Sequence, residues 1–357
     1  MGKVLMKGNE AIGEAAIRAG CLNYFAYPIT PQSEVAEYLA RRMPEVGGVF
    51  LQGESEVAVG YMIFGAAGCG ARVFTTSSSP GISLMSEALS YITCAQCPAV
   101  FVNIMRGGPG LGGILPSQGD YFQATKGGGH GDYRLLVMAP ASVQEAVEMV
   151  MAAFPLAEKY RNPVMILGDG LIGQMMEPVA FPEDLLSEPT NKDDWATTGI
   201  GNRSGDTPNL VKSLFLDPAQ LNDHNLLLKA KYDRMRRDEV RYEAYNLDGD
   251  YRVLIVSYGT MSRVCRTAID SLKEEGLEVA MIRPQTLFPF PEAAIREAAG
   301  KEGCRLAVSI EMSMGQMVED VERSIQGRCP VEWYGKCGGE VPTPEEIVDV
   351  VRGLLQR

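Results

Sequence analysis

The chain has 357 residues, of which 46% are apolar and 22% charged, a composition typical of folded globular proteins rather than disordered ones. Its formal net charge of −12 argues against a nucleic-acid-binding protein, because a phosphate backbone would repel the average surface. We see no signal-peptide pattern and no run of about 18 apolar residues, so we expect a cytoplasmic protein without a membrane span.

Residues 1–182 predict a first domain in which apolar strands alternate with helices. The predicted strands are NYFAY, GVFLQ, RVFTTS, AVFVNIM, RLLVMAP and PVMILGD, and the predicted helices cover 31–43, 56–69, 81–94 and 141–159. Near-continuous apolar strands that are separated by helices indicate a parallel sheet covered on both faces.

Residues 183–249 predict a linker, and residues 250–357 predict a second domain. The linker begins with the polar segment SEPTNKDDWATTGIGNRSGDTPN, and NLLLKAKYDRMRRDEVRYEAYN then predicts an exposed connecting helix. In the second domain the strands YRVLIVSYG, LEVAMIRP, RLAVSIEM and PVEWYGK alternate with helices at 261–275, 291–299, 314–327 and 343–356. The predicted fold class is therefore α/β with two parallel-sheet domains.

The first predicted strand ends in YPITP, which places Thr30 directly before Pro31. The carboxyl ends of parallel strands are where open α/β sheets bind ligands. The Thr30 hydroxyl suits a helix cap with Pro31 at the first helical position, and it equally suits hydrogen bonding to a substrate carboxylate.

Two acids, Glu54 and Glu56, precede a helix made almost entirely of small and apolar residues. A carboxylate in this position is either a surface group stabilised by the helix dipole or a group buried for a purpose. Small side chains also allow a flat ligand or another backbone to come close.

Two further strand ends carry polar or glycine-rich segments. TTSSSPG ends in Ser79, Pro80 and Gly81, where free N–H groups could bind an anion or could simply be capped. Arg106 begins a long glycine-rich loop, and its guanidinium could bind a carboxylate through two hydrogen bonds. His130 in the same loop is either a proton donor or an ordinary exposed histidine.

The eight cysteines show no disulfide framework, and we expect reduced thiols. Cys94 and Cys97 form one CxxC pair, which cannot hold an iron–sulfur cluster alone and is a weak candidate for a redox pair. Asp169 lies in a Gly-Asp-Gly segment, and we interpret it as a turn residue at a strand end rather than as a metal–diphosphate ligand.

The segments YPITP, ESE, TTSSSPG and RGGPG, in this order, resemble the α-type subunits of the 2-oxoacid:ferredoxin oxidoreductases. The start MGKVLMKGNEAI and the glycine-rich loop are most similar to the branched-chain, 2-oxoisovalerate-using members. The resemblance implies a pyrimidine-type thiamine-diphosphate-binding domain followed by a transketolase C-terminal-like domain. The implied activity is the coenzyme A-dependent oxidative decarboxylation of a branched-chain 2-oxoacid to acyl-CoA and carbon dioxide, with ferredoxin as electron acceptor.

The resemblance also implies roles for single residues. Glu56, rather than Glu54, would contact the aminopyrimidine ring of thiamine diphosphate. Thr30 and Arg106 would hold the carboxylate and carbonyl oxygen of the substrate, and the turn Ser79–Gly81 would border the cofactor.

The resemblance further implies that this chain provides half of an active site. A β-type subunit would hold the diphosphate and Mg²⁺, and the [4Fe-4S] clusters would lie on partner subunits. These partners include a γ and a ferredoxin-like δ subunit. No metal site is expected on this chain, and activity requires the complex.

Three alternatives remain open at this stage. The chain could belong to a pyruvate- or 2-oxoglutarate-specific enzyme, it could be the β chain of a lipoamide-linked 2-oxoacid dehydrogenase, or it could be a non-catalytic scaffold subunit. The apolar residues Leu111, Ile114 and Leu115 in the glycine-rich loop favour a branched aliphatic substrate, because a 2-oxoglutarate enzyme needs an additional cation.

Overall fold

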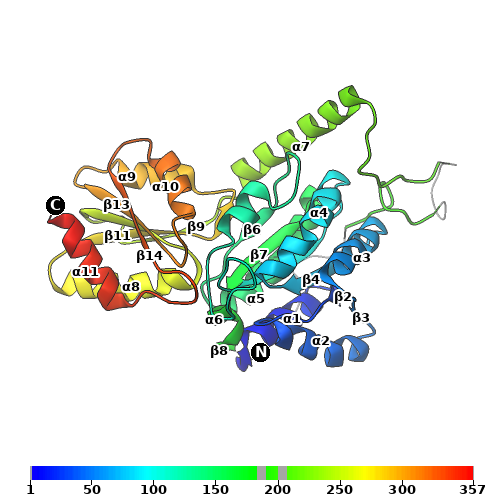
Figure 1. Cartoon of the computed structure of the whole chain (residues 1–357), viewed down its shortest axis with the longest axis horizontal. Coiled ribbons are helices and arrows are strands. Elements are labelled where there is room, and N and C mark those ends of the chain that lie inside the picture. Colours follow the sequence, from blue (N-terminus) through cyan, green and yellow to red (C-terminus); the bar gives the residue numbers. More distant parts are fainter. Residues whose placement is uncertain (1, 183–189, 200–206, 357) are drawn as a thin grey trace.

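The computed structural model describes residues 2–182, 190–199 and 207–356, and it has two α/β units side by side (Figure 1). The N-terminal unit lies at the right of this view and the C-terminal unit at the left. Parts of the predicted linker, residues 183–189 and 200–206, lie outside the described residues. No helix in the described ranges is long and apolar enough to span a membrane.

The N-terminal unit is built on a seven-stranded sheet with the strand order β12-β6-β7-β5-β4-β2-β3. All six predicted strands are confirmed, as β2 Asn23–Ala26, β3 Val49–Gln52, β4 Val73–Ser77, β5 Val100–Met105, β6 Leu136–Met138 and β7 Val164–Asp169. These six strands are all parallel to one another. The central strands β4, β5 and β7 are buried along their whole length, which explains why β5 and β7 are mostly apolar in the sequence.

Helices cover the N-terminal sheet, and four of them were predicted. The helices of this unit are α1 Gly8–Arg18, α2 Ser33–Glu45, α3 Glu56–Gly68, α4 Ser79–Cys94, α5 Val143–Tyr160 and the short α6 Gly170–Gln174. The four predicted helices are α2, α3, α4 and α5. The helix α1 was not predicted. It begins at Gly8, where only glycine fits, because a Cβ atom there would lie 1.8 Å from the carbonyl oxygen of Ile172. A small antiparallel ribbon of β1 Val4–Lys7 and β8 Met176–Val179 lies beside it.

The C-terminal unit has a five-stranded sheet with the order β14-β13-β10-β11-β9. Its strands are β9 Tyr242–Tyr245, β10 Val253–Val256, β11 Val279–Pro284, β13 Leu306–Glu311 and β14 Val331–Gly335. The four predicted helices are confirmed, as α8 Gly259–Glu274, α9 Glu292–Ala299, α10 Met317–Ile325 and α11 Pro344–Leu355. Thr343 and Glu346 form a capping box at the start of α11.

The boundary between linker and second domain differs from the predicted position at 249/250. The connecting helix α7, Pro218–Asp238, ends earlier than expected, and β9 at Tyr242–Tyr245 already belongs to the second sheet. This strand is antiparallel to β11, so the second sheet is not wholly parallel. The strand β9 lies at the edge of the sheet, and this position tolerates its alternating polar residues. The sequence had predicted these residues to lie in the connecting helix.

The two units share a strand as well as an interface. The short strand β12, Thr286–Phe288, follows β11 in the chain but pairs antiparallel with β6 in the N-terminal sheet. At the same interface, Arg283 forms two 2.8 Å hydrogen bonds with the carboxylate of Glu145. The second domain is therefore joined to the first by backbone pairing and by a bidentate ion pair.

A segment within the glycine-rich loop, residues 118–121, is also held by the second unit. The backbone N–H of Gln118 donates to the Met312 carbonyl oxygen (2.8 Å), and the Met312 N–H donates to Gln118 Oε1 (2.9 Å). The Tyr121 hydroxyl donates to Asp320 (2.6 Å). A π-helical turn, η1 Gln123–Gly127, then leads out of this segment.

A buried ion pair fastens the far side of the N-terminal unit. Arg72 donates from Nε and Nη2 to the two oxygens of Glu158, at 2.8 and 3.0 Å, and Lys192 lies 2.9 Å from the same carboxylate. Burial alone would raise the pKa of Glu158, but the hydrogen bonds from Arg72 and Lys192 outweigh it and lower the pKa to about 2.

We expect the Glu158→Gln substitution to destabilise the protein by about 3 kcal/mol above pH 4.5, the usual pKa of the group. Because the folded-state pKa is depressed, this contribution is complete above pH 4.5 and disappears as the pH falls toward 2. Urea unfolding of both proteins across this range measures the difference. The exposed Glu148 of the same helix provides a control, and its change to glutamine should leave the pH profile unaltered.

Candidate active site

The predicted site residues lie in the turns that follow β2, β3, β4 and β5, at the carboxyl edge of the N-terminal sheet. Thr30 follows β2, Glu56 follows β3, the turn 78–81 follows β4 and Arg106 follows β5. Because neighbouring parallel strands all end at this edge, the fold brings together residues from positions 30 to 106.

Glu56 is the first residue of α3 and is buried, with 6% of its surface exposed, whereas Glu54 is exposed. The preceding Ser55 caps the helix by accepting a hydrogen bond from the Ala58 N–H. Within the described part of the chain, no hydrogen bond or ion pair reaches the Glu56 carboxylate. A buried carboxylate is costly without a partner, so its position points to a ligand-facing role.

The turn after β4 packs directly against this carboxylate. A Cβ atom at Gly81 would lie 2.9 Å from Glu56 Oε1 and 2.1 Å from Ser77 Oγ, so only glycine fits. The hydroxyls of Ser77 and Ser78 are buried and have no hydrogen-bond partner among the described residues. The unsatisfied Ser77 hydroxyl and the Glu56 carboxylate thus both lie beside Gly81.

The N–H group and the hydroxyl of Ser79 are both hydrogen-bonded within the chain. Its N–H donates to Asn103 Oδ1 (3.0 Å), its hydroxyl donates to Asp120 (2.6 Å), and the Arg106 N–H donates to that hydroxyl (3.0 Å). The free N–H group that the sequence suggested at Ser79 is therefore not available to an anion. Contact between a cofactor and Ser79, Pro80 or Gly81 stays a prediction.

Asp120 and Asn103 were not predicted as site residues. Asn103 Nδ2 donates to Asp120 at 2.9 Å, and burial raises the pKa of Asp120 although this bond and the one from Ser79 oppose the rise. An asparagine at the end of a buried strand was the only signal in the sequence. The pair connects the start of α4 to the end of the glycine-rich loop.

Arg106 fixes the loop to the turn after β2. The side chain is buried, Nη1 donates to the Thr30 carbonyl oxygen (2.9 Å), and Nη2 donates to the Leu111 carbonyl oxygen (3.1 Å). The guanidinium thus binds two backbone segments, and its buried Nε–H group has no hydrogen-bond partner among the described residues.

Thr30 does not cap a helix, so that interpretation of the sequence is wrong. The helix α2 begins at Ser33 with Gln32 as its N-cap residue, and the Thr30–Pro31 peptide bond is cis. Thr30 is exposed beside Arg106, and its hydroxyl has no partner among the described residues.

The other candidate residues lie apart from this cluster or serve the fold. His130 is exposed and its ring contacts Tyr91 edge-on, beside the C-terminal half of α4. Burial raises the pKa of Cys97 to about 12 and also raises that of Cys94, which disfavours the thiolate that redox chemistry requires. Asp169 caps α6, accepting hydrogen bonds from the N–H groups of Leu171 and Ile172.

Comparison with known proteins gives two family matches that together cover most of the chain. Residues 14–217 match the family described as "Pyruvate flavodoxin/ferredoxin oxidoreductase, thiamine diP-bdg". Residues 252–347 match "Pyruvate:ferredoxin oxidoreductase core domain II". These ranges correspond to the N-terminal sheet with its connecting segment and to the second sheet.

Individual relatives agree with these matches. The "Ketoisovalerate oxidoreductase subunit VorB" of Methanothermobacter thermautotrophicus is 48% identical over 99% of this chain and 98% of its own length. A 2-oxoglutarate:ferredoxin oxidoreductase from Magnetococcus marinus, solved with 2-oxoglutarate, coenzyme A and succinyl-CoA bound, is 29% identical with a TM-score of 0.85. The match covers 98% of this chain but only 65% of that longer chain.

A split-gene transketolase has the same fold at 15% identity, with a TM-score of 0.60 over 98% of both chains. The two predicted α/β domains are therefore those of a thiamine-diphosphate-binding fold followed by a transketolase-like unit. The chain belongs to the 2-oxoacid:ferredoxin oxidoreductase family, as an α-type subunit, in agreement with the order of its four sequence motifs.

Proposed function

We propose that this chain provides the aminopyrimidine-facing half of the active site in a branched-chain 2-oxoacid:ferredoxin oxidoreductase. The reaction is the coenzyme A-dependent oxidative decarboxylation of 2-oxoisovalerate or a similar 2-oxoacid to acyl-CoA and carbon dioxide. The observation that supports it most is the buried Glu56 carboxylate, which has no partner among the described residues and packs against Gly81 at the carboxyl edge of the sheet. The ketoisovalerate oxidoreductase subunits that are 46–48% identical to this chain support the substrate class.

The residues present fit the pyrimidine ring of thiamine diphosphate. A ring with nitrogen atoms on its edge needs hydrogen-bonding groups within a dry surface. Glu56 and Ser77 offer a carboxylate and a hydroxyl without partners among the described residues, both beside Gly81. When bound, the cofactor supplies the electron sink for decarboxylation. Glu56 would hold a proton at a ring nitrogen, and its burial strengthens this hydrogen bond.

Arg106 and Thr30 would position the substrate. Two guanidinium nitrogens of Arg106 hold the Thr30 and Leu111 carbonyl groups, so the arginine fixes the geometry of both segments. The Arg106 Nε proton and the Thr30 hydroxyl remain for the substrate carboxylate and its carbonyl oxygen. Such preorganised donors stabilise developing charge without reorganisation during the reaction.

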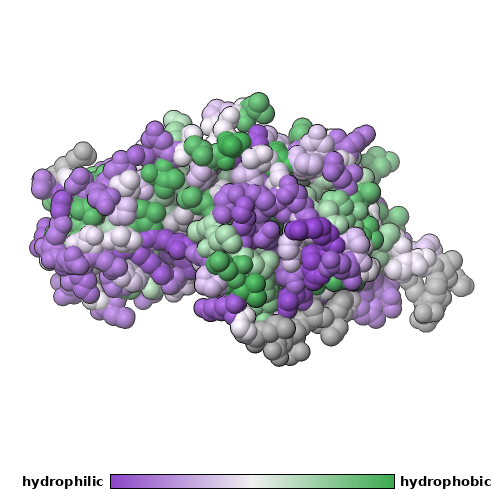
Figure 2. Space-filling model, turned by 90° about the horizontal axis from the view of Figure 1, so that it is seen from below, coloured by the Kyte–Doolittle hydropathy of each residue, from purple (hydrophilic) through white to green (hydrophobic). Residues whose placement is uncertain are grey.

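Exposed apolar side chains on the helices next to the site support docking of a partner subunit. The helix α3 is apolar on all sides, yet Val57 and Tyr61 are 41% and 39% exposed, and Leu84 on α4 is 53% exposed. Figure 2 shows that hydrophobic patches also interrupt the hydrophilic surface on the face seen from below, in the part where the N-terminal unit lies. We assign the α3–α4 surface to the β-type subunit.

The remaining parts of the reaction belong to partners in this proposal. The β-type subunit would hold the diphosphate and Mg²⁺, and [4Fe-4S] clusters on partner subunits, including the ferredoxin-like δ chain, would pass electrons to ferredoxin. A γ subunit completes the complex. All eight cysteines are free thiols, which supports a cytoplasmic location, where thiols are kept reduced.

The purified complex should prefer branched-chain 2-oxoacids. The loop residues Leu111, Ile114 and Leu115 expose 84%, 59% and 57% of their surface, which suits an aliphatic tail and provides no cation for a second carboxylate. With methyl viologen and coenzyme A, we expect kcat/KM for 2-oxoisovalerate to exceed that for 2-oxoglutarate by about tenfold or more.

A higher kcat/KM for 2-oxoglutarate or pyruvate would contradict the substrate assignment but not the family. Activity that depends on a lipoyl protein instead of methyl viologen would contradict the reaction type.

A further inference from the structure

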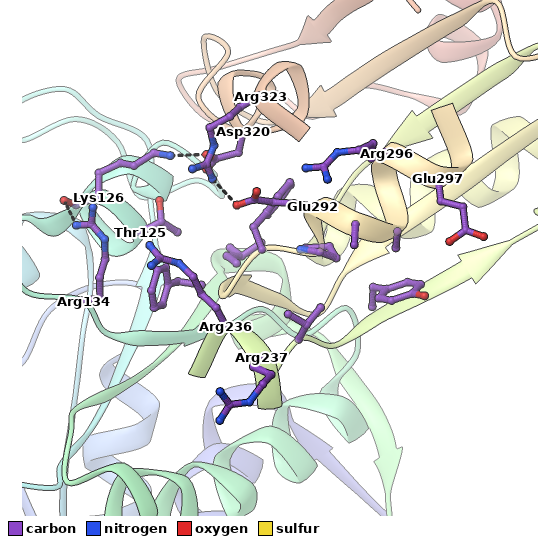
Figure 3. A pocket seen from close by; sticks show the side chains of 18 residues that line it. Thr125, Lys126, Arg134, Arg236, Arg237, Glu292, Arg296, Glu297, Asp320 and Arg323 are labelled. Atoms are coloured by element: carbon purple, nitrogen blue, oxygen red, sulfur yellow. Dashed lines mark hydrogen bonds and ion pairs between the residues drawn. The ribbon is translucent and has the colours of Figure 1, made fainter. Parts of the chain in front are cut away.

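A cavity of about 560 Å³ lies between the two units, on residues that the proposed reaction does not use (Figure 3). The N-terminal unit contributes η1 and the segment before β6, the connecting helix α7 contributes its last turn, and the C-terminal unit contributes α9 and α10. Its volume is within the range of small-molecule sites in proteins.

The cavity is cationic although the protein as a whole is acidic. Six basic side chains and three carboxylates line it, while the whole chain has a net charge of −12. The basic residues are Lys126, Arg134, Arg236, Arg237, Arg296 and Arg323. Figure 3 shows the guanidinium of Arg236 beside Arg134, whereas Arg237 points away from the other labelled side chains.

Two of the three carboxylates are already neutralised. Asp320 lies 2.5 Å from Lys126 Nζ and 3.2 Å from Arg323, which also bonds to Glu292 at 2.8 Å. These pairs use Lys126 and Arg323 and leave the other basic groups without a carboxylate partner inside the cavity.

Arg134, Arg236 and Arg296 are not neutralised by any described carboxylate within the cavity. Arg134 donates only to the carbonyl oxygens of Lys126 and Tyr133, and Arg296 donates only to that of Ser324. Neither forms an ion pair with any described residue. Arg236 pairs with Asp233 on the exposed side of its own helix. The guanidinium groups of Arg134, Arg236 and Arg296, which come from three different segments, therefore line the same cavity without a described carboxylate partner inside it.

Apart from Thr125, the rest of the lining is apolar or aromatic. Leu287, Phe288 and Phe290 form part of the wall, and Arg236 lies over the Phe288 ring at 5.2 Å. Tyr242 is 43% exposed and can present its ring to a flat group. Guanidinium groups bind phosphate through paired hydrogen bonds, and an aromatic surface suits a base.

We propose that this interdomain cavity binds an adenine nucleotide, with its phosphates on Arg134, Arg236 and Arg296 and its base against the aromatic wall. A free nucleotide such as ADP and the nucleotide end of coenzyme A share this chemistry. The ligand would join both units and the connecting helix. The site is separate from the proposed catalytic residues, and the proposal does not depend on the substrate assignment.

Isothermal titration of the full chain with ADP tests the proposal. We expect saturable binding, adenosine to bind at least tenfold more weakly, and the double variant Arg134→Gln/Arg296→Gln to weaken ADP binding about tenfold or more, because each charge-assisted bond to phosphate is lost. The variant Arg41→Gln/Arg305→Gln removes the same charge at exposed positions outside the cavity and should bind ADP normally.

A titration with coenzyme A distinguishes the two sources. Competition between coenzyme A and ADP that the double variant abolishes identifies coenzyme A as a ligand of this cavity, and ADP binding without competition identifies a free nucleotide. No ADP binding up to about 1 mM would overturn the proposal. Equal binding to both double variants, or citrate binding as tightly as ADP, would overturn it as well.

Discussion

Glu56→Gln in the assembled complex is expected to lower kcat by about a thousandfold while subunit assembly is unchanged. The amide is nearly isosteric with the carboxylate, so the packing against Gly81 and Ser77 is kept. What is lost is a negative charge that can hold a proton at a ring nitrogen within a buried site. Steady-state reduction of methyl viologen, together with size-exclusion chromatography of the complex, measures both properties.

Glu54→Gln is the matched control, because Glu54 lies two residues away but is exposed. We expect its kcat to stay within about twofold of the unaltered complex, as for most surface substitutions. Normal activity in the Glu56→Gln complex would instead support a scaffold role for this chain. Loss of activity together with loss of the β-type subunit would show that Glu56 contributes to assembly.

Glu311→Gln is expected to destabilise the chain by about 3 kcal/mol, the largest effect on stability that we expect from the C-terminal unit. The carboxylate is fully buried and accepts hydrogen bonds from the hydroxyls of Ser309 and Ser313 and from the N–H groups of Gln316, Met317 and Val318. An amide presents an NH₂ group to donors that need an acceptor, at the start of α10 where negative charge is favoured.

Urea unfolding of the full chain measures this effect as a shift of the midpoint at unchanged slope. The control is Glu322→Gln, an exposed acid on the helix α10, whose first N–H groups Glu311 binds. For this variant a change within about 0.5 kcal/mol is expected. Equal midpoints for the two variants would show that the hydrogen bonds of Glu311 are replaced by water or by rearrangement.

The elements with the strongest apolar patterns were predictable from the sequence. The strands β4, β5 and β7 are buried at every position, so their composition alone identifies them. The helix α1 was not, because its residues GNEAIGEAAIR include glycines that are required by close packing and that lower helix propensity. The three-residue strand β12 could not be predicted, since its partner lies in the other domain.

The sequence predicted where the candidate site residues lie in the fold better than it predicted their hydrogen bonds. The buried position of Glu56 and the exposed position of Glu54 agree with the motif order. The bonds of Arg106 to two carbonyl groups were not predictable, because they depend on the path of a glycine-rich loop that has no periodic pattern. Ser79 likewise looked free in the sequence and is bonded to Asp120 in the fold.

The pairing of β12 with β6 has a consequence for biosynthesis. The edge of the N-terminal sheet at β6 is covered by residues 286–288, which the ribosome produces long after the rest of that sheet. Until translation passes Phe288, the nascent chain presents an uncovered strand edge, and such edges promote aggregation. Chaperone binding to β6 during synthesis would protect the chain in this interval.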